Sequence, residues 1–160
     1  SQALRLAKDF VKDDPFCVIL GDNIFQSELR QYVIQFREKI TKVKTWNPCG
    51  MVLLKEVPDP CRYGVAVIEN DAVSRFVEKP SEPISPWAVT GIYFYCGQGI
   101  FDIIDGLKPS GRGELENTDL NQEQLKMGTM FYQELDGYWT DAGTHDSLWR
   151  ASQFVRGVSK

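Results

Sequence analysis

An unbroken run of five apolar residues, Phe16 to Leu20, is the feature that most constrains the fold of this chain. Such a run is typical of a strand buried on both faces of a parallel sheet, whereas a half-buried strand alternates apolar and polar residues. Gly21, Asp22 and Asn23 follow the run directly. Because open α/β sheets bind ligands at the carboxyl ends of their strands, Asp22 is a candidate to hold a divalent cation against phosphate oxygens. The alternative is that Asp22 turns the chain or caps the next helix.

Composition and charge exclude several other classes of protein. The 160 residues carry a net charge of −4, which argues against a general nucleic-acid-binding protein. No apolar run approaches membrane-spanning length, and no signal peptide opens the chain. The four cysteines lack the spacing of zinc ligands, and Cys17 and Cys96 are predicted to be reduced thiols in the core. We therefore expect one cytoplasmic domain with no nucleic-acid or membrane partner.

The order of the predicted elements favours an α/β domain. Apolar residues at helical spacing predict helices over residues 1–14 and 29–43, and a buried strand follows at 49–57. The first strand, the second helix and this strand form a β-α-β unit, for which a right-handed crossover is expected. The remaining expected elements are a hairpin turning at Asn70-Asp71, a strand over 87–96, helices over 100–107 and 118–128, a strand over 129–135 and a helix whose N-cap is Thr144.

Three short segments carry side chains suited to a phosphorylated or hydroxylated ligand. Glu78 and Lys79 precede a proline that fixes the turn, so a lysine for phosphate and a glutamate for hydroxyls point in one direction. Taken alone, this pair is better explained as a solvated charge pair at a strand end. Arg112 lies between glycines and is a reasonable phosphate contact, although such loops are common. Gly64 after Tyr63 either admits a ligand hydroxyl or simply turns the chain.

A fourth segment repeats the setting of Asp22. Asp141 ends a strand and precedes a turn of small residues, so Asp22 and Asp141 could share one metal ion. Asp141, His145 and Asp146 could instead form a local transition-metal trio. A histidine in the first turn of a helix more commonly makes a hydrogen bond, which disfavours the trio.

Together these segments resemble the sugar nucleotidyltransferases. Six motifs occur in the family's order, namely LGDNIF (20–25), DPCRYGV (59–65), EKP (78–80), AVTGIYFY (88–95), LKPSGRGELENTDLN (107–121) and WTDAGTHDSLWRAS (139–152). Within the family, the chain is most similar to the enzymes that join glucose 1-phosphate to thymidine triphosphate, with uridine the next candidate base. The resemblance implies a Rossmann-like nucleotidyltransferase fold of the α/β class. Its sheet would be mixed and mostly parallel, with helices on both faces and an inserted sugar-binding hairpin region.

The resemblance also implies roles for nine residues, each at a position that matches a family motif. The implied ligands of Mg²⁺, the expected cofactor, are Asp22 and Asp141. The implied catalytic residues are Asp22, Lys79, Arg112 and Asp141. The implied sugar contacts are Tyr63, Gly64, Glu78, Val89 and Trp139, with Lys79 and Arg112 on the sugar phosphate. One departure is Ala142, which stands where the family commonly has threonine.

The implied reaction joins a sugar 1-phosphate to a nucleoside triphosphate and releases pyrophosphate. Residues 1–160 lack the family's N-terminal signature, a glycine-rich loop with an arginine and a lysine that cradles the triphosphate, and the family's C-terminal helices. We therefore expect a partial nucleotidyltransferase domain over 1–160 that is inactive alone and forms a homo-oligomer or pairs with a completing chain. The alternatives are a non-catalytic sugar-phosphate-binding or regulatory module, and an interaction subunit that completes its sheet with a separate chain.

Overall fold

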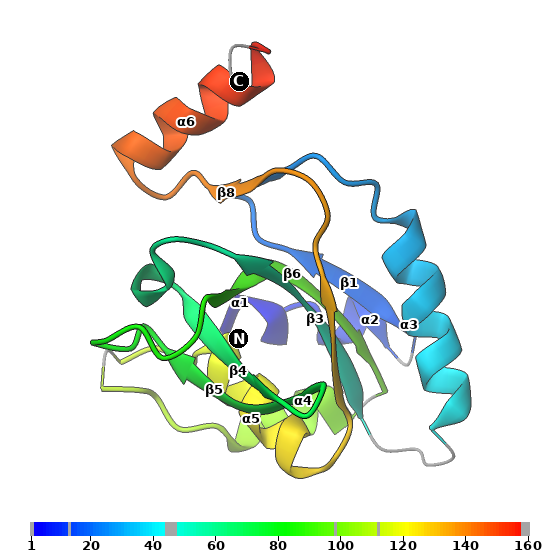
Figure 1. The fold of residues 1–160 in the computed structure, drawn as a ribbon. Helices are drawn as coiled ribbons and strands as arrows, with labels where there is room; N and C mark the ends of the chain where they lie inside the picture. The colour runs from blue at the N-terminus through cyan, green and yellow to red at the C-terminus, as the bar shows by residue number, and fades with distance from the viewer. Residues whose placement is uncertain (1, 13, 44–47, 98, 112, 158–160) are drawn as a thin grey trace.

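The computed structural model describes residues 2–12, 14–43, 48–97, 99–111 and 113–157, which form a central sheet, a small second sheet and flanking helices (Figure 1). The strands are β1 (Phe16–Ile19), β2 (Asn23–Phe25), β3 (Cys49–Glu56), β4 (Gly64–Glu69), β5 (Ala72–Glu78), β6 (Trp87–Cys96), β7 (Met130–Glu134) and β8 (Trp139–Asp141). The helices are α1 (Gln2–Arg5), α2 (Lys8–Val11), α3 (Arg30–Lys42), α4 (Gly99–Gly106), α5 (Asn117–Lys126) and α6 (His145–Val155), with a 3₁₀ turn η1 (Pro60–Arg62).

Strand β6 organises the central sheet, whose order is β5-β4-β6-β3-β7 with β1 also paired to β6. Strand β3 runs along one edge of β6, while β4 and β1 share the other edge, β4 at residues 87–88 and β1 at residues 92–95. The mixed sheet is as expected, but parallel pairing is not the majority. Among the described strands only β3 and β7 pair in parallel. An apolar run indicates burial, and it does not indicate the direction of the neighbouring strand.

The expected β-α-β unit is present with a strand between its members. Strands β1 and β3 are both antiparallel to β6, so they run parallel to each other on either side of it. Helix α3 connects them and lies beside the sheet in Figure 1. The unit therefore has the expected order of elements. Strand β6, which follows later in the sequence, lies between its two strands in the sheet.

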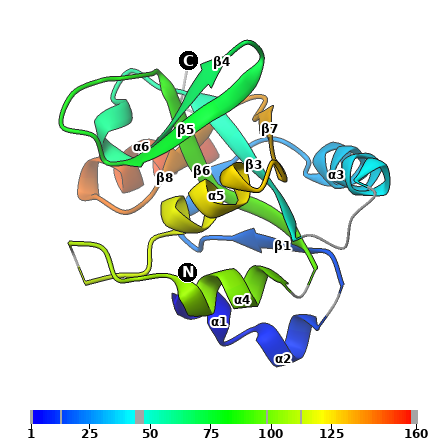
Figure 2. The same cartoon turned by 90° about the horizontal axis from the view of Figure 1, so that it is seen from below.

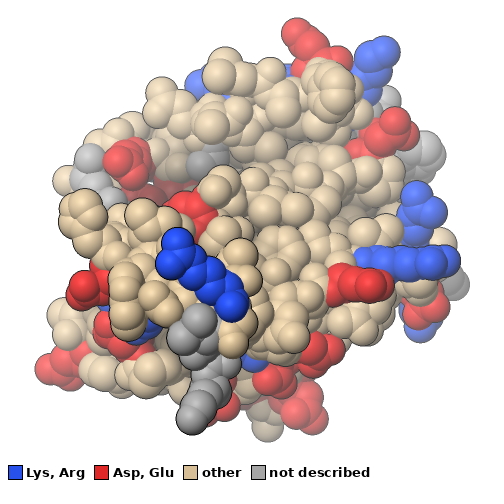
Figure 3. All heavy atoms as spheres, turned by 90° about the horizontal axis from the view of Figure 1, so that it is seen from above, with Lys and Arg blue, Asp and Glu red and all other residues tan. Residues whose placement is uncertain are grey.

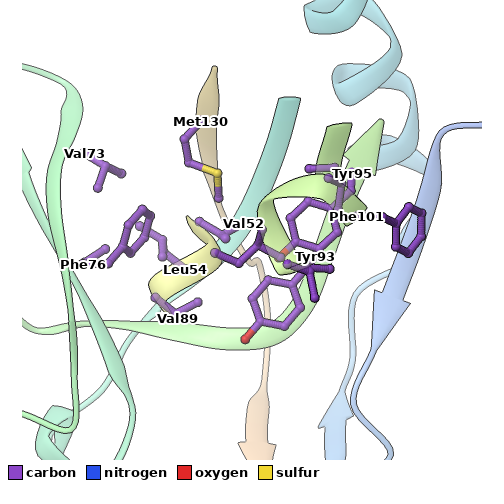
Figure 4. Packing of buried hydrophobic residues seen from close by; sticks show 13 residues of the cluster. Val52, Leu54, Val73, Phe76, Val89, Tyr93, Tyr95, Phe101 and Met130 are labelled. Atoms are coloured by element: carbon purple, nitrogen blue, oxygen red, sulfur yellow. The ribbon is translucent and has the colours of Figure 1, made fainter. Parts of the chain in front are cut away.

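Helices cover both faces of the sheet, as expected. Along β3, Val52 and Leu54 face a cluster that includes residues of α4 and α5, while Met51 and Leu53 face a second cluster that includes residues of α3. Figure 2 shows α4 and α5 on one side of the strands, with α1 and α2 beyond α4. Figure 4 shows the first cluster, in which Phe76, Val89, Tyr95 and Met130 surround Val52 and Leu54. The alternation along β3 places the core on both sides of the sheet.

Strand β1 contradicts the expectation of a strand buried on both faces. Phe16 and Val18 are half-buried, and Cys17 and Ile19 are exposed. In the described part of the chain β1 pairs with β6 alone, so its other edge has no strand beside it. Phe16 still packs near Tyr95 and Phe101, with ring centroids 5.8 and 6.0 Å apart. One face of β1 therefore reaches the core and the other does not.

The cysteines also differ from the prediction of reduced core thiols. Cys49 and Cys96 are register partners on β3 and β6, and their sulfurs form a disulfide. Cys17 is free but exposed, so neither Cys17 nor Cys96 is a reduced thiol in the core. Spacing along the chain gave no indication of this pair because the two strands meet only in the folded sheet.

Local signals placed the turns and caps correctly. Asn70 and Asp71 have φ of 51° and 60°, as the two-residue turn between β4 and β5 requires. Thr144 caps α6 in a capping box with Ser147. The expected helix over 1–14 is divided into the short helices α1 and α2. In the residues that the structure describes, no helix has the length and hydropathy to cross a membrane.

Candidate active site

A cavity of about 260 Å³ opens where β1 ends and β4 begins on the shared edge of β6. The gap between these strands falls at residues 89–91 of β6, and Val89 and Gly91 form part of the cavity wall. Of the predicted site residues, the cavity brings together Asp22, Tyr63, Gly64, Glu78, Lys79, Val89, Trp139 and Asp141. Arg112 lies outside the described residues. Residues of different motifs, up to 119 positions apart in the sequence, thus line one cavity. The functional role of each residue remains a prediction.

The two candidate metal ligands converge because β2 and β8 pair. Asn23 is the register partner of Asp141, and the N–H of Ala142 donates to the carbonyl oxygen of Asp22 at 2.7 Å. A Cβ added to Gly143 would lie 3.1 Å from Oδ2 of Asp141 and 3.5 Å from Oδ2 of Asp22. Both carboxylates therefore point at the space that glycine leaves open.

This pair fits a magnesium ion that takes its other ligands from phosphate and water. Mg²⁺ in such sites commonly uses one or two carboxylates and keeps several oxygen ligands from substrate and solvent. Within the described ranges, no three His, Cys, Asp or Glu side chains are grouped to hold a metal. The transition-metal trio of Asp141, His145 and Asp146 is therefore not formed.

Asp141 is held by several donors. Nη2 of Arg62 lies 3.3 Å from each carboxylate oxygen, and the hydroxyl of Tyr63 donates to Oδ1 at 2.9 Å. The N–H of Gly143 donates to Oδ2 at 3.3 Å. Burial, and then the hydrogen bond to Asp141 and its charge, raise the pKa of Tyr63 to about 12. The phenol therefore remains a donor at neutral pH.

Asn23 connects the carboxylate pair to β6, a role that the motif analysis did not assign. Its Oδ1 accepts from Nε1 of Trp139 at 2.7 Å and from the N–H of Gly91 at 2.9 Å, while its Nδ2 donates to Asp22 at 2.9 Å. A Cβ at Gly91 would overlap the Asn23 amide. The sequence signal that could have identified this contact is the amide directly after Asp22 together with a glycine inside an otherwise bulky strand.

The opposite wall of the cavity is built by the β4–β5 hairpin and α5. Gly64 and Glu78 are register partners, so the hairpin sets them side by side. The hydroxyl of Thr118 donates to Oε2 of Glu78, and a Cβ at Gly64 would lie 2.8 Å from that hydroxyl. Lys79 is exposed and has φ of 41°, a strained value for a residue before proline. The N–H of Lys79 donates to the carbonyl oxygen of Tyr63 at 3.0 Å, and this contact fixes Lys79 at the rim of the cavity.

Tyr93 of β6 joins the two walls. Its ring belongs to the first core cluster, and Figure 4 shows its hydroxyl pointing away from the cluster. Burial raises the pKa of Tyr93 to about 12, the charges of Glu78 and Asp22 add to the rise, and a hydrogen bond with Asn117 opposes it. A neutral phenol therefore lies between the carboxylate pair and the hairpin wall.

Comparison with known proteins identifies the class. A family model described as nucleotidyl transferase matches residues 1–157, and this chain belongs to that family. The relatives it matches include glucose-1-phosphate thymidylyltransferases. The one from Neisseria meningitidis serogroup A is 38% identical over 99% of this chain, and the one from Xanthomonas campestris pv. campestris strain B100 is 40% identical over 99%. The chain spans 54% and 52% of those two proteins, about half their length.

Solved structures have the same fold. A Bacillus anthracis protein assigned as a glucose-1-phosphate thymidylyltransferase, in complex with sucrose, superposes with a TM-score of 0.86 at 48% identity and covers 99% of this chain. A UDP-glucose pyrophosphorylase complexed with UDP-glucose gives a TM-score of 0.81 at 25% identity over 98% of this chain. This chain covers 61% and 62% of those two chains.

Proposed function

We propose that this domain supplies the sugar-phosphate and metal sites of a nucleotidyltransferase that joins glucose 1-phosphate to dTTP and releases pyrophosphate. The observation that carries the proposal is the convergence of Asp22 and Asp141 on Gly143, in the cavity that also holds Glu78 and Lys79. The names of the two glucose-1-phosphate thymidylyltransferases that the chain matches support glucose as the sugar and thymidine as the base. We place the reaction in the cytoplasm, with Mg²⁺ as the cofactor.

The chemistry requires two polyanions to meet. A phosphate oxygen of the sugar phosphate must attack the α-phosphorus in line while the negative charges of both substrates repel. Magnesium held by Asp22 and Asp141 would supply positive charge at the reacting phosphates. Lys79 neutralises the sugar phosphate from the rim, and Arg112 is assigned the same role from its position in a family motif alone. Glu78 and the backbone at Gly64 orient the sugar hydroxyls, because they are set side by side by the hairpin.

Binding of glucose 1-phosphate to the 160-residue chain tests the proposal by calorimetry in the presence of Mg²⁺. Lys79→Ala is expected to weaken binding by roughly 1.5–3 kcal/mol, the range for a hydrogen bond to a charged group. Lys126→Ala is the matched control, because Lys126 is an exposed lysine of α5 paired with Glu123. It should leave the affinity unchanged. Equal affinities for Lys79→Ala and the unmodified chain would return Lys79 to an ordinary surface charge.

A further inference from the structure

The guanidinium of Arg62 lies between two carboxylates of different exposure. On one side Nη2 is 3.3 Å from both oxygens of Asp141, whose side chain is 17% exposed. On the other side Nε is 3.9 Å from Oδ2 of Asp59, whose side chain is 63% exposed. The guanidinium also lies 5.2 Å from the ring of Tyr63. Arg62 thus has an inner partner at the cavity and an outer partner in solvent.

The two converging carboxylates differ in how their charge is balanced. Asp141 is paired with Arg62, whereas among the described residues no lysine or arginine nitrogen lies within salt-bridge distance of Asp22. Asp22 accepts from the neutral amide of Asn23. A cation shared by the pair would meet one carboxylate that is already neutralised.

We propose that Arg62 is the counter-charge of Asp141 in the cation-free site, and that it lowers the site's affinity for a divalent cation by competing for Asp141. The proposal rests on the proposed function in one respect, the assignment of Asp22 and Asp141 as cation ligands. When a cation occupies the pair, Arg62 turns to Asp59, which its Nε already approaches. Because Asp59 is exposed, this move keeps the guanidinium paired at little desolvation cost.

Mn²⁺ binding to the 160-residue chain, followed by the electron paramagnetic resonance signal of free Mn²⁺, tests this assignment. Arg62→Met removes the charge and keeps an unbranched side chain. It is expected to tighten Mn²⁺ binding about tenfold, since a charged hydrogen bond to Asp141 no longer has to be broken. Unchanged or weaker binding would overturn the proposal. Arg62→Lys, which restores a positive charge, should return the affinity toward that of the unmodified chain, and failure to do so also counts against it.

Two controls separate competition at Asp141 from simpler effects. Arg75→Met removes the same charge from the exposed face of β5 and should change the affinity less than about twofold. Equal tightening by both substitutions would assign the effect to net charge and overturn the proposal. Asp59→Asn should weaken Mn²⁺ binding in the unmodified chain and have no effect beside Arg62→Met. Equal weakening in both backgrounds would overturn the move of Arg62 to Asp59.

The same measurement separates this proposal from the proposed function. Asp141→Asn is expected to abolish the binding of Mn²⁺ at the pair. If it does so and Arg62→Met fails to tighten binding, the metal site stands and only the role of Arg62 is overturned. If Asp141→Asn leaves binding unchanged, the metal assignment fails and the role of Arg62 fails with it. Far-UV circular dichroism of each variant establishes that the comparison is made between folded proteins.

Discussion

Strands β3 and β1 lie on opposite edges of β6, and both are apolar runs, yet only β3 is buried. The first six residues of β3 are buried, because α3 covers one face and α4 and α5 cover the other. None of the four residues of β1 is fully buried. An apolar run therefore makes burial of a strand favourable, but the elements packed on each face determine whether the strand is buried.

The β1 side of the molecule presents an apolar groove of about 490 Å³. Leu6 and Phe10 of the N-terminal segment are 87% and 90% exposed beside it. Leu20, Tyr93 and Asn117 line both this groove and the candidate active site. The exposed flank and the site therefore share a wall, so a partner bound on the flank would contact residues of the site as well.

Helix α6, near the other end of the described chain, also exposes large apolar side chains. It projects from the rest of the molecule beside β8 in Figure 1, and Leu148, Trp149 and Val155 are 51%, 64% and 73% exposed. Figure 3 views the molecule from this side, and charged side chains there gather around the margin more than over the middle. Large apolar side chains exposed together on one helix are a feature of surfaces that bind other protein.

The largest expected effect is on catalysis. The 160-residue chain alone should give no detectable pyrophosphate from dTTP and glucose 1-phosphate, because the sequence of residues 1–160 contains no segment that resembles the family's glycine-rich loop, which would hold the α-phosphorus in line. A full-length glucose-1-phosphate thymidylyltransferase assayed beside it provides the positive control. Robust turnover by a monomer of this chain would contradict this expectation and would show that the exposed flank at β1 needs no further cover for activity.

Much of the fold was accessible from the sequence where its causes are local. The Asn70-Asp71 turn, the Thr144 cap and the end of α5 near Gly128 all follow from residues adjacent in sequence. The β4–β5 hairpin then sets Gly64 opposite Glu78, so that part of the cavity wall was also within reach of local signals.

What could not be predicted depends on contacts between distant segments. The pairing of β2 with β8 joins Asn23 to Asp141 through strands of three residues, which are too short for a periodic signal. The contacts of Asn23, Arg62 and Thr118 in the site became visible only once these strands had met. The convergence of Asp22 and Asp141 was predicted from their similar settings at strand ends and from matching positions in the family, and the β2–β8 ladder gives the physical reason for it.

Truncating one side chain on β1 and its register partner on β6 measures how much the burial of each strand contributes to stability. Ile19 of β1 and Ile92 of β6 lie opposite each other in the sheet, but Ile19 is 46% exposed and Ile92 is fully buried. Ile92→Ala should lower the free energy of unfolding by about 2–5 kcal/mol, and Ile19→Ala by less than about 1 kcal/mol. Urea unfolding followed by circular dichroism gives both values. Equal losses would mean that β1 is as buried as its partner.

Self-association of the 160-residue chain is expected through the open edge of β1. Ile19→Lys places a charge on that edge and should weaken association more than about tenfold, because edge charges oppose strand pairing. Ile34→Lys is the matched control, since Ile34 is 49% exposed on α3. Sedimentation equilibrium provides the association constants. If both substitutions weaken association alike, or the unmodified chain is monomeric, β1 is not the contact.

The smallest expected effect concerns Tyr93, whose ionisation reports how much water the β1 flank admits. Burial is the main cause that raises its pKa from the usual 10.0 to about 12. Below pH 10 the phenol is protonated in both states and its contribution to stability is complete. As the pH rises from 10 to 12 the unfolded chain loses this proton first, so stability falls by about 1.4 kcal/mol per pH unit. Urea unfolding at pH 9 and pH 11 should show a smaller loss in Tyr93→Phe than in the unmodified chain, because Tyr63, whose pKa is also raised to about 12, contributes to the loss in both proteins. An identical fall in both proteins would mean that water reaches Tyr93 from the β1 side and that its phenol titrates as it does in the unfolded chain.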